Sequence, residues 1–163
     1  TQDSSSWSRR RIRKGGKGMR KEAIREILHR LDLERKKILG PRLHELGLTV
    51  GEGQGRTLLC LLKEGPMTQK ELADLCMRDT ATVSRNLDKL ERAGLLTREN
   101  NPESRRSFLI CLTKEGEEKA RKVRQIFQEL DEQIWGEIPE ADMERLYEIL
   151  ARVEKNLELG NDG

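Results

Sequence analysis

The chain has 163 residues, of which 37% are charged and 3% aromatic, and its formal net charge is +3. This length suits one domain with a hydrophobic core, and so much charge with so few aromatics is typical of helical proteins with large solvated surfaces. No apolar run approaches the roughly 20 residues of a membrane-spanning helix, and the N-terminal residues lack the apolar stretch of a secretory signal. We therefore expect a cytoplasmic protein that is not associated with a membrane.

The charge is unevenly distributed along the chain. Residues 1–18 have a net charge of +5, whereas residues 113–163 have one of −6. The first segment is rich in Ser, Gly and Arg and has no periodicity, which predicts flexible chain. It is either a basic arm that strengthens binding to nucleic acid or an extension without a role that precedes a natural start at Met19. We expect residues 160–163 to be a disordered tail.

The residue types that carry most catalytic and metal chemistry are few and scattered. The cysteines are Cys60, Cys76 and Cys111, and the histidines are His29 and His44. Their spacing gives neither a disulfide framework nor a zinc site, so we expect no cofactor, no metal, and thiols that are mostly buried. No nucleophile–base pair or phosphate-binding loop is visible either, which disfavours an enzyme.

Apolar residues three and four positions apart predict a helix over residues 20–39. The following segment, residues 40–55, is punctuated by Gly and Pro and is expected to bend or form a loop. Residues 56–63 hold nearly consecutive leucines, which indicates a central buried helix that ends before Pro66.

Two helix starts with capping signals follow. Thr68 and Glu71 have the spacing of a capping box, and Leu72, Leu75 and Cys76 are expected to face inward. Asp79 is a good N-cap for a second helix that runs to about residue 93, where Gly94 supplies a left-handed stop. Two short helices joined by a short turn are the helix-turn-helix arrangement.

A hairpin and two long helices complete the predicted order. Residues 95–99 and 107–112 have strand composition, and residues 100–106 between them contain turn residues and two arginines. This predicts a wing with a basic tip. A helix is expected from Thr113 to about Trp135, and a last one from Pro139, with a clean apolar stripe.

The stretches "MTQKELADLCMRDTATVSRNLDKLERAGLLTRE" and "SRRSFLICLTKEG" resemble the MarR family of bacterial winged-helix regulators. The resemblance implies a mainly α fold with a small β-wing: a winged helix-turn-helix lobe over 56–112 and dimerisation helices over 20–46 and 113–159, within a domain of residues 19–159. It also implies a homodimer that binds double-stranded DNA, usually as a repressor that answers a small molecule. Ser104 stands where wings of the family usually carry Asp, and Met77 where many members carry Gly.

The helix that begins after Asp79 is the expected recognition helix. Arg85 lies two residues past Val83, about 200° round a helix, and so points away from the core. Its guanidinium can bind guanine edges, while Lys89 and Arg92 lie further along and suit phosphates. The residues expected to contact DNA are Thr68, Gln69, Arg78, Thr80, Ala81, Thr82, Ser84, Arg85, Lys89, Arg98, Arg105 and Arg106.

Other roles stay open at this point. Thr68 and Gln69 would hold a phosphate through free N–H groups at their helix start, and the wing arginines would enter a minor groove or clamp its backbone. His44, Arg56 and Cys60 are the weak candidates for an effector site. The alternatives are a winged helix that binds another protein, and a thiol-based redox sensor, although the Cys that redox-sensing members carry in the first helix is missing here.

Overall fold

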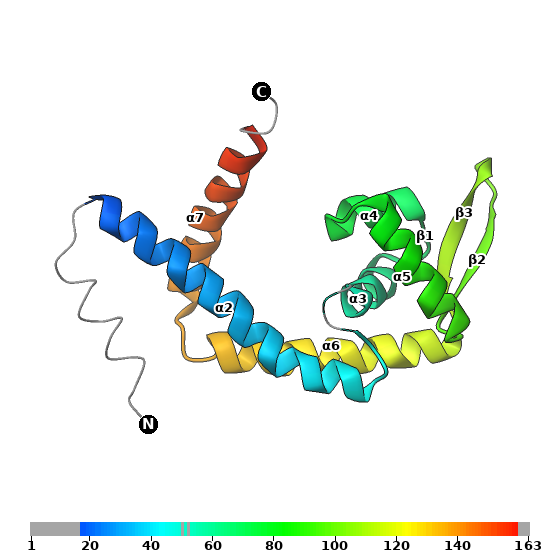
Figure 1. Ribbon diagram of the computed structural model, residues 1–163, viewed down its shortest axis with the longest axis horizontal. Coiled ribbons are helices and arrows are strands. Elements are labelled where there is room, and N and C mark those ends of the chain that lie inside the picture. Colours follow the sequence, from blue (N-terminus) through cyan, green and yellow to red (C-terminus); the bar gives the residue numbers. More distant parts are fainter. Residues whose placement is uncertain (1–16, 50, 52, 160–163) are drawn as a thin grey trace. The chain divides into compact units, whose positions relative to one another are not determined.

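The computed structural model describes residues 17–49, 51 and 53–159. The predicted tail, and the predicted arm up to residue 16, lie outside the described residues. The helices and strands are α2 (Lys17–Glu45), α3 (Gln54–Glu64), β1 (Met67–Thr68), α4 (Gln69–Cys76), α5 (Thr80–Arg92), β2 (Leu96–Asn101), β3 (Ser104–Leu112), α6 (Lys114–Trp135) and α7 (Glu140–Leu159). Figure 1 shows these elements, and they confirm the mainly helical fold with a small sheet.

The chain divides into two compact units, and the division falls inside α6, between Val123 and Arg124. The first turns of α6 therefore pack with the winged lobe. Ala120 and Val123 are fully buried, and a Cβ added at Gly55 of α3 would lie 3.5 Å from Cγ1 of Val123. The sequence predicted α6 as a dimerisation helix, but its first half also contributes to the core of the winged lobe.

The core of the first unit comes from every element of the lobe. Its most buried side chains include Leu58 of α3, Leu72 of α4, Leu87 and Leu90 of α5, Leu96 of β2 and Ile110 of β3. The apolar face predicted for α5 is therefore confirmed. Leu75 was expected to face inward and does not: its side chain is 49% exposed, because Leu72, Ala73 and Cys76 form the buried face of α4.

The helix-turn-helix has the capping groups that the sequence predicts. Glu71 N–H donates to Oγ1 of Thr68 at 3.3 Å, and Thr68 N–H donates to Oε2 of Glu71 at 2.8 Å, which completes the capping box. Asp79 caps α5 through Thr82, and Gly94 ends it with a φ of +74°. These local signals place α5 after a turn of only three residues, Met77–Asp79.

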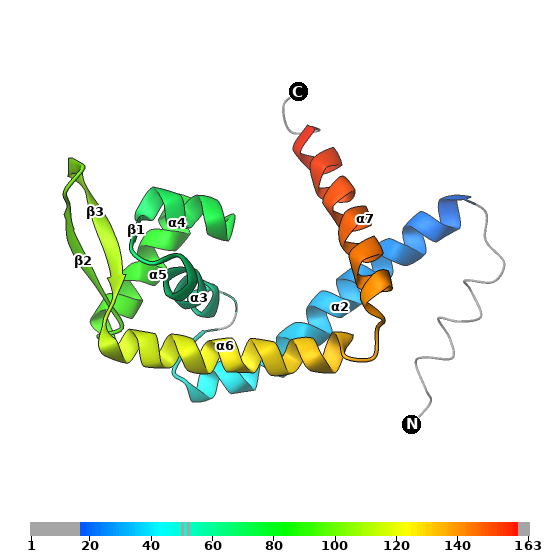
Figure 2. The ribbon, with the colours of Figure 1, turned by 180° about the vertical axis from the view of Figure 1, so that it is seen from behind.

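The sheet has three antiparallel strands in the order β1-β3-β2. The sequence did not predict β1, whose two residues pair Met67 with Ile110 and Thr68 with Leu109. The wing is also longer than predicted. Asn101 pairs with Ser104, so the turn is only Pro102–Glu103, and Arg105 and Arg106 belong to β3 rather than to the loop. Figures 1 and 2 show β2 and β3 projecting as a hairpin beside α4 and α5.

The long helix α2 overturns the prediction of a bend after Leu39. It continues through Gly40 and Pro41 to Glu45, and the loop begins only there. Leu39 and Leu43, one on each side of Pro41, are 6% and 3% exposed. Burial of these two side chains holds the helical path, although proline removes one backbone donor from it.

The turn between α4 and α5 contains a strained residue. Met77 has a φ of +49° and a ψ of +46°, the left-handed conformation that only glycine adopts without cost, and its side chain is 77% exposed. We expect Met77→Gly to raise the free energy of unfolding by about 1 kcal/mol, because it removes a left-handed penalty larger than the added entropy of glycine in the unfolded chain.

Chemical denaturation of the two proteins measures this difference. The control is Met77→Ala, which removes the same side chain but keeps a Cβ and should bring no gain. Equal stability of the glycine and alanine variants would contradict the strain at this position.

Candidate nucleic-acid interface

The first turn of α5 holds its arginine through a chain of polar contacts. Asp79 accepts the Thr82 N–H at 2.8 Å and the Thr82 hydroxyl at 2.6 Å, and the two bonds hold the pKa of its carboxyl below the usual value. The same hydroxyl oxygen accepts from Nη2 of Arg85 at 3.1 Å. The N-cap of the helix therefore also orients the guanidinium of Arg85.

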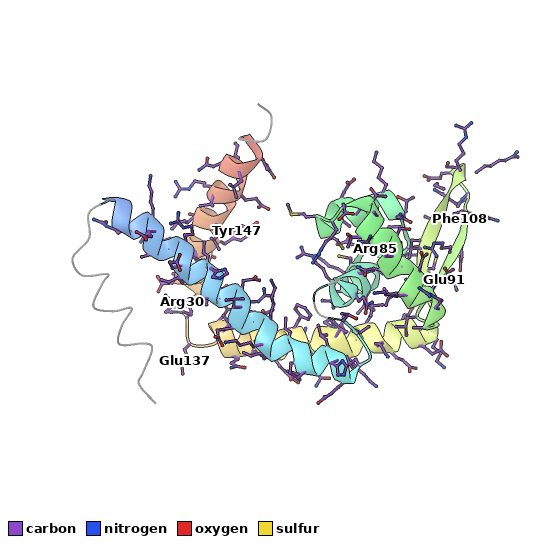
Figure 3. The ribbon with its side chains drawn as sticks, viewed as in Figure 1. Arg30, Arg85, Glu91, Phe108, Glu137 and Tyr147 are labelled. Carbon is purple, nitrogen blue, oxygen red and sulfur yellow. The ribbon has the colours of Figure 1, made fainter. Side chains whose placement is uncertain are left out.

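The predicted base-contacting residues lie on one outer face of α5. Thr80, Ala81 and Arg85 are exposed, and Thr82 and Ser84 are half-buried. Figure 3 labels Arg85 on this helix and Phe108 on the neighbouring hairpin. Asn86 was not predicted to matter and is only 4% exposed. Asn86 is thus buried in the lobe beside the exposed Arg85, and no spacing rule in the sequence indicates this.

Arg98, one of the predicted DNA contacts, forms ion pairs with two carboxylates. Its Nη2 lies 2.7 Å from Oδ1 of Asp88, and its Nη1 contacts Oε2 of Glu91. Both carboxylates belong to α5, and the Arg98 side chain is 22% exposed. The guanidinium thus joins β2 to the recognition helix. It also offsets the negative charge of two carboxylates on the helix that should face DNA.

The remaining cations of α5 lie near its C-terminal end. Lys89 and Arg92 are exposed, and Nε of Arg92 donates to the carbonyl oxygen of Asp88 at 3.2 Å. A cation near the last carbonyls is favourable for the helix itself. Both side chains also remain exposed toward solvent.

The wing tip presents two arginines. Arg105 and Arg106 are exposed, and in the described part of the chain neither has a carboxylate partner. They fall where the β2–β3 register shifts, between the pairs Asn100–Phe108 and Asn101–Ser104. A bulge of this kind redirects side chains. The Arg106 N–H donates to Oγ of Ser104 at 3.4 Å, a long bond from the position where the family usually has Asp.

A hollow of about 350 Å³ joins the wing to the start of α4. Its lining comes from α4 and its cap, from β2 and from β3: Thr68, Gln69, Lys70, Arg98, Arg106, Ser107, Phe108 and Ile110. The structure therefore brings together four of the predicted contact residues. One part of the prediction is wrong: the Thr68 N–H is not free, because it donates to Glu71. Gln69 and Lys70 still offer first-turn N–H groups that no helical carbonyl can accept.

The other candidates lie elsewhere. Arg78 is exposed, and its Nε would be 3.5 Å from a Cβ added at Gly53, so it lies over the loop before α3. His44 and Arg56 are exposed on α2 and α3, and Cys60 is half-buried. None of the three proposed effector residues lines the hollow beside the wing.

Within the described residues, no three His, Cys, Asp or Glu side chains are grouped as a metal ion would require. Nor is any helix there long and apolar enough to cross a membrane.

Comparison with known proteins identifies the arrangement. The model of the MarR family matches residues 51–108. YwoH, an uncharacterized HTH-type transcriptional regulator of Bacillus subtilis, is 29% identical over 123 residues, 74% of this chain and 88% of the relative. The organic hydroperoxide resistance transcriptional regulator of the same organism is 32% identical over 90 residues, 55% of this chain and 60% of that protein.

A solved structure shares the fold along most of both chains. The S. aureus MepR–DNA complex has a TM-score of 0.72 and 27% identity, and the match covers 81% of this chain and 96% of that one. The family model lies on the lobe that carries the capped recognition helix and most of the wing, and the structural match extends beyond it. Over residues 51–108 the chain matches the MarR family, and along most of its length its fold is similar to that of MepR.

Proposed function

We propose that this protein is a transcription regulator that binds double-stranded DNA as a homodimer, in the cytoplasm, and represses until a small molecule is bound. The observation that carries DNA binding is the outer face of α5. Its first turns are exposed, and Arg85 is oriented by Thr82 and Asp79. The basic wing tip and the start of α4 flank this face. The relative solved with DNA supports the same use of the fold.

Each contact has a chemical reason. Residues 80–85 contact base edges in the major groove, where Arg85 binds guanine O6 and N7 through two N–H groups. Arg105 and Arg106 contact the adjacent minor groove or its phosphates. Lys89, Arg92 and the N–H groups of Gln69 and Lys70 bind phosphates, which position the protein without specifying sequence.

Dimerisation follows from apolar helix faces that the chain leaves exposed. On α2, the side chains of Ile24, Leu28 and Leu31 are 57%, 48% and 46% exposed, and on α7, Tyr147 and Leu157 are 75% and 69% exposed. Isolated exposed leucines are ordinary, but rows of them on long helices mark contact surfaces. A second copy with two-fold symmetry covers these faces and sets two recognition helices about one DNA turn, ~34 Å, apart.

The small-molecule effector acts by changing the distance between the two recognition helices of the dimer. A small molecule that binds one arrangement of the dimer better than the other shifts the population of the two, and DNA affinity changes with it. His44, Arg56 and Cys60 remain the candidate effector residues.

The test is selection of bound sequences from a library of randomised duplexes, followed by anisotropy titration of the enriched sequence. We expect a two-fold symmetric motif and a stoichiometry of two chains per duplex. If each protomer neutralises about two phosphates, affinity should fall roughly 100-fold between about 50 and 200 mM salt. A library with no enriched motif and no salt-dependent binding would overturn the proposal in favour of a protein-binding winged helix.

A further inference from the structure

Two thiols that lie far apart in the sequence touch in the fold. Cys60 is on α3, Cys76 is the last residue of α4, and their sulfur atoms are 3.8 Å apart. No motif in the sequence joins them. The third thiol, Cys111 on β3, is instead 3.9 Å from the carbonyl oxygen of Leu109. Close packing of α3 on α4 therefore creates a dithiol inside the lobe that presents the recognition helix.

The two thiols differ in how accessible they are. Cys76 is 7% exposed, and burial, with the neighbouring Cys60 as a second cause, raises the pKa of its thiol to about 11. Cys60 is half-buried, so it is the more accessible of the two to a small oxidant. Reactivity follows access as well as thiolate character. Cys60 is thus the thiol that is oxidised first, and Cys76 is placed to attack the oxidised Cys60 sulfur.

We propose that a hydroperoxide converts Cys60 and Cys76 into a reversible intramolecular disulfide, and that this bond weakens DNA binding. The first half of this proposal, formation of the disulfide, rests only on the contact between the two thiols. The second half, weaker DNA binding, also rests on the proposed function.

The reaction balances with hydrogen peroxide as the oxidant. The Cys60 sulfur attacks one peroxide oxygen, the O–O bond breaks, and the products are a Cys60 sulfenic acid and one water. The Cys76 sulfur then attacks the Cys60 sulfur, the S–OH bond breaks, and the thiol proton leaves with the hydroxide as a second water. The two sulfurs lose two electrons, which reduce one peroxide to two waters. A dithiol reductant reverses the change by thiol–disulfide exchange.

The bond would displace the recognition helix because of where Cys76 lies. A disulfide brings the sulfurs from 3.8 Å to about 2.05 Å. Close-packed helices transmit such a shift rather than absorb it. Cys76 ends α4, and only Met77–Asp79 separate it from α5. The first turn of α5 includes Thr82, whose hydroxyl orients Arg85.

Mass spectrometry of the full chain tests the first half without DNA. Trypsin places each cysteine in its own peptide, residues 57–63, 71–78 and 107–114. After hydrogen peroxide, we expect the protein to lose two hydrogens and the first two peptides to be linked, with Cys111 still free. Cys111→Ser, the matched control, should form the same link, and Cys60→Ser should form none. A link that involves Cys111 or a second chain, or no link at all, would overturn the proposal.

Anisotropy titration of the selected duplex tests the second half. Oxidised wild-type protein should bind about 10-fold more weakly than reduced protein, and dithiothreitol should restore the affinity. Cys60→Ser should bind as reduced wild type does, before and after peroxide. If the disulfide forms completely and the affinity for DNA is unchanged, the second half of the proposal is wrong and the first half stands. If the reduced protein binds no DNA, the proposed function is wrong instead.

Discussion

Arg85→Ala is expected to lower affinity for the selected duplex by about 10- to 100-fold while leaving affinity for unrelated DNA nearly unchanged. The side chain is exposed, and its Nη2 is held 3.1 Å from the Thr82 hydroxyl, which Asp79 fixes in turn. A guanidinium oriented before binding loses little freedom when it pairs with a guanine edge. Competition titrations against selected and scrambled duplexes measure the two affinities separately.

Arg92→Ala is the matched control on the same helix. It also removes one exposed arginine, but at the end that suits phosphates. We expect it to weaken both duplexes alike and to make the salt dependence shallower by about one counterion per protomer. If Arg85→Ala instead weakens both duplexes equally, or changes neither affinity, residues 80–85 do not contact bases and the recognition face must be reassigned.

The features predicted well from sequence are those set by local chemistry. The Thr68 capping box, the Asp79 cap and the Gly94 stop each depend on residues within one helical turn, and each appears in the structure. Helical periodicity likewise predicted the buried face of α5, because the spacing of Val83, Leu87 and Leu90 records that face directly.

The features missed are those set by neighbours distant in sequence. Arg98 looked like another surface cation, since nothing in its own strand indicates that Asp88 and Glu91 lie opposite. The contact between Cys60 and Cys76 depends on how α3 packs on α4. Pairing with β3 produces β1, a strand too short for any periodicity.

The helix through Pro41 shows tertiary packing overriding a local signal. Gly and Pro in succession predict an end to α2, but buried side chains on both sides keep it helical. The wing is a related case: turn residues predicted a loop of seven residues, and cross-strand pairing reduces it to two. In both regions the local preference was real and a larger packing energy opposed it.

Gly116→Ala is expected to lower the free energy of unfolding by about 3 kcal/mol or more. An ideal Cβ at this position would lie 1.8 Å from the carbonyl oxygen of Leu95 and 2.8 Å from its carbonyl carbon. Backbone cannot move aside as a flexible side chain can. The Gly116 N–H also donates to Oγ1 of Thr113 at 3.0 Å, and the Thr113 N–H donates to that same Leu95 oxygen at 3.1 Å, so the start of α6 is tied down where the methyl would enter. Thermal and urea denaturation of the two proteins measure the loss.

The direction of the stability change at Gly116 distinguishes a clash with the Leu95 carbonyl from the ordinary effect of glycine in a helix. Glycine inside a helix is normally the weaker choice, so replacement by alanine should stabilise by up to about 1 kcal/mol. Gly55 of α3 is the control: it is buried in the same lobe, but its added Cβ would make ordinary contacts at 3.5 Å with Val123 and 3.6 Å with Leu43. We expect Gly55→Ala to be neutral or stabilising. A Gly116→Ala protein as stable as wild type would mean that α6 does not start against the Leu95 carbonyl, whereas opposite signs at the two glycines would show that this contact holds α6 on the lobe.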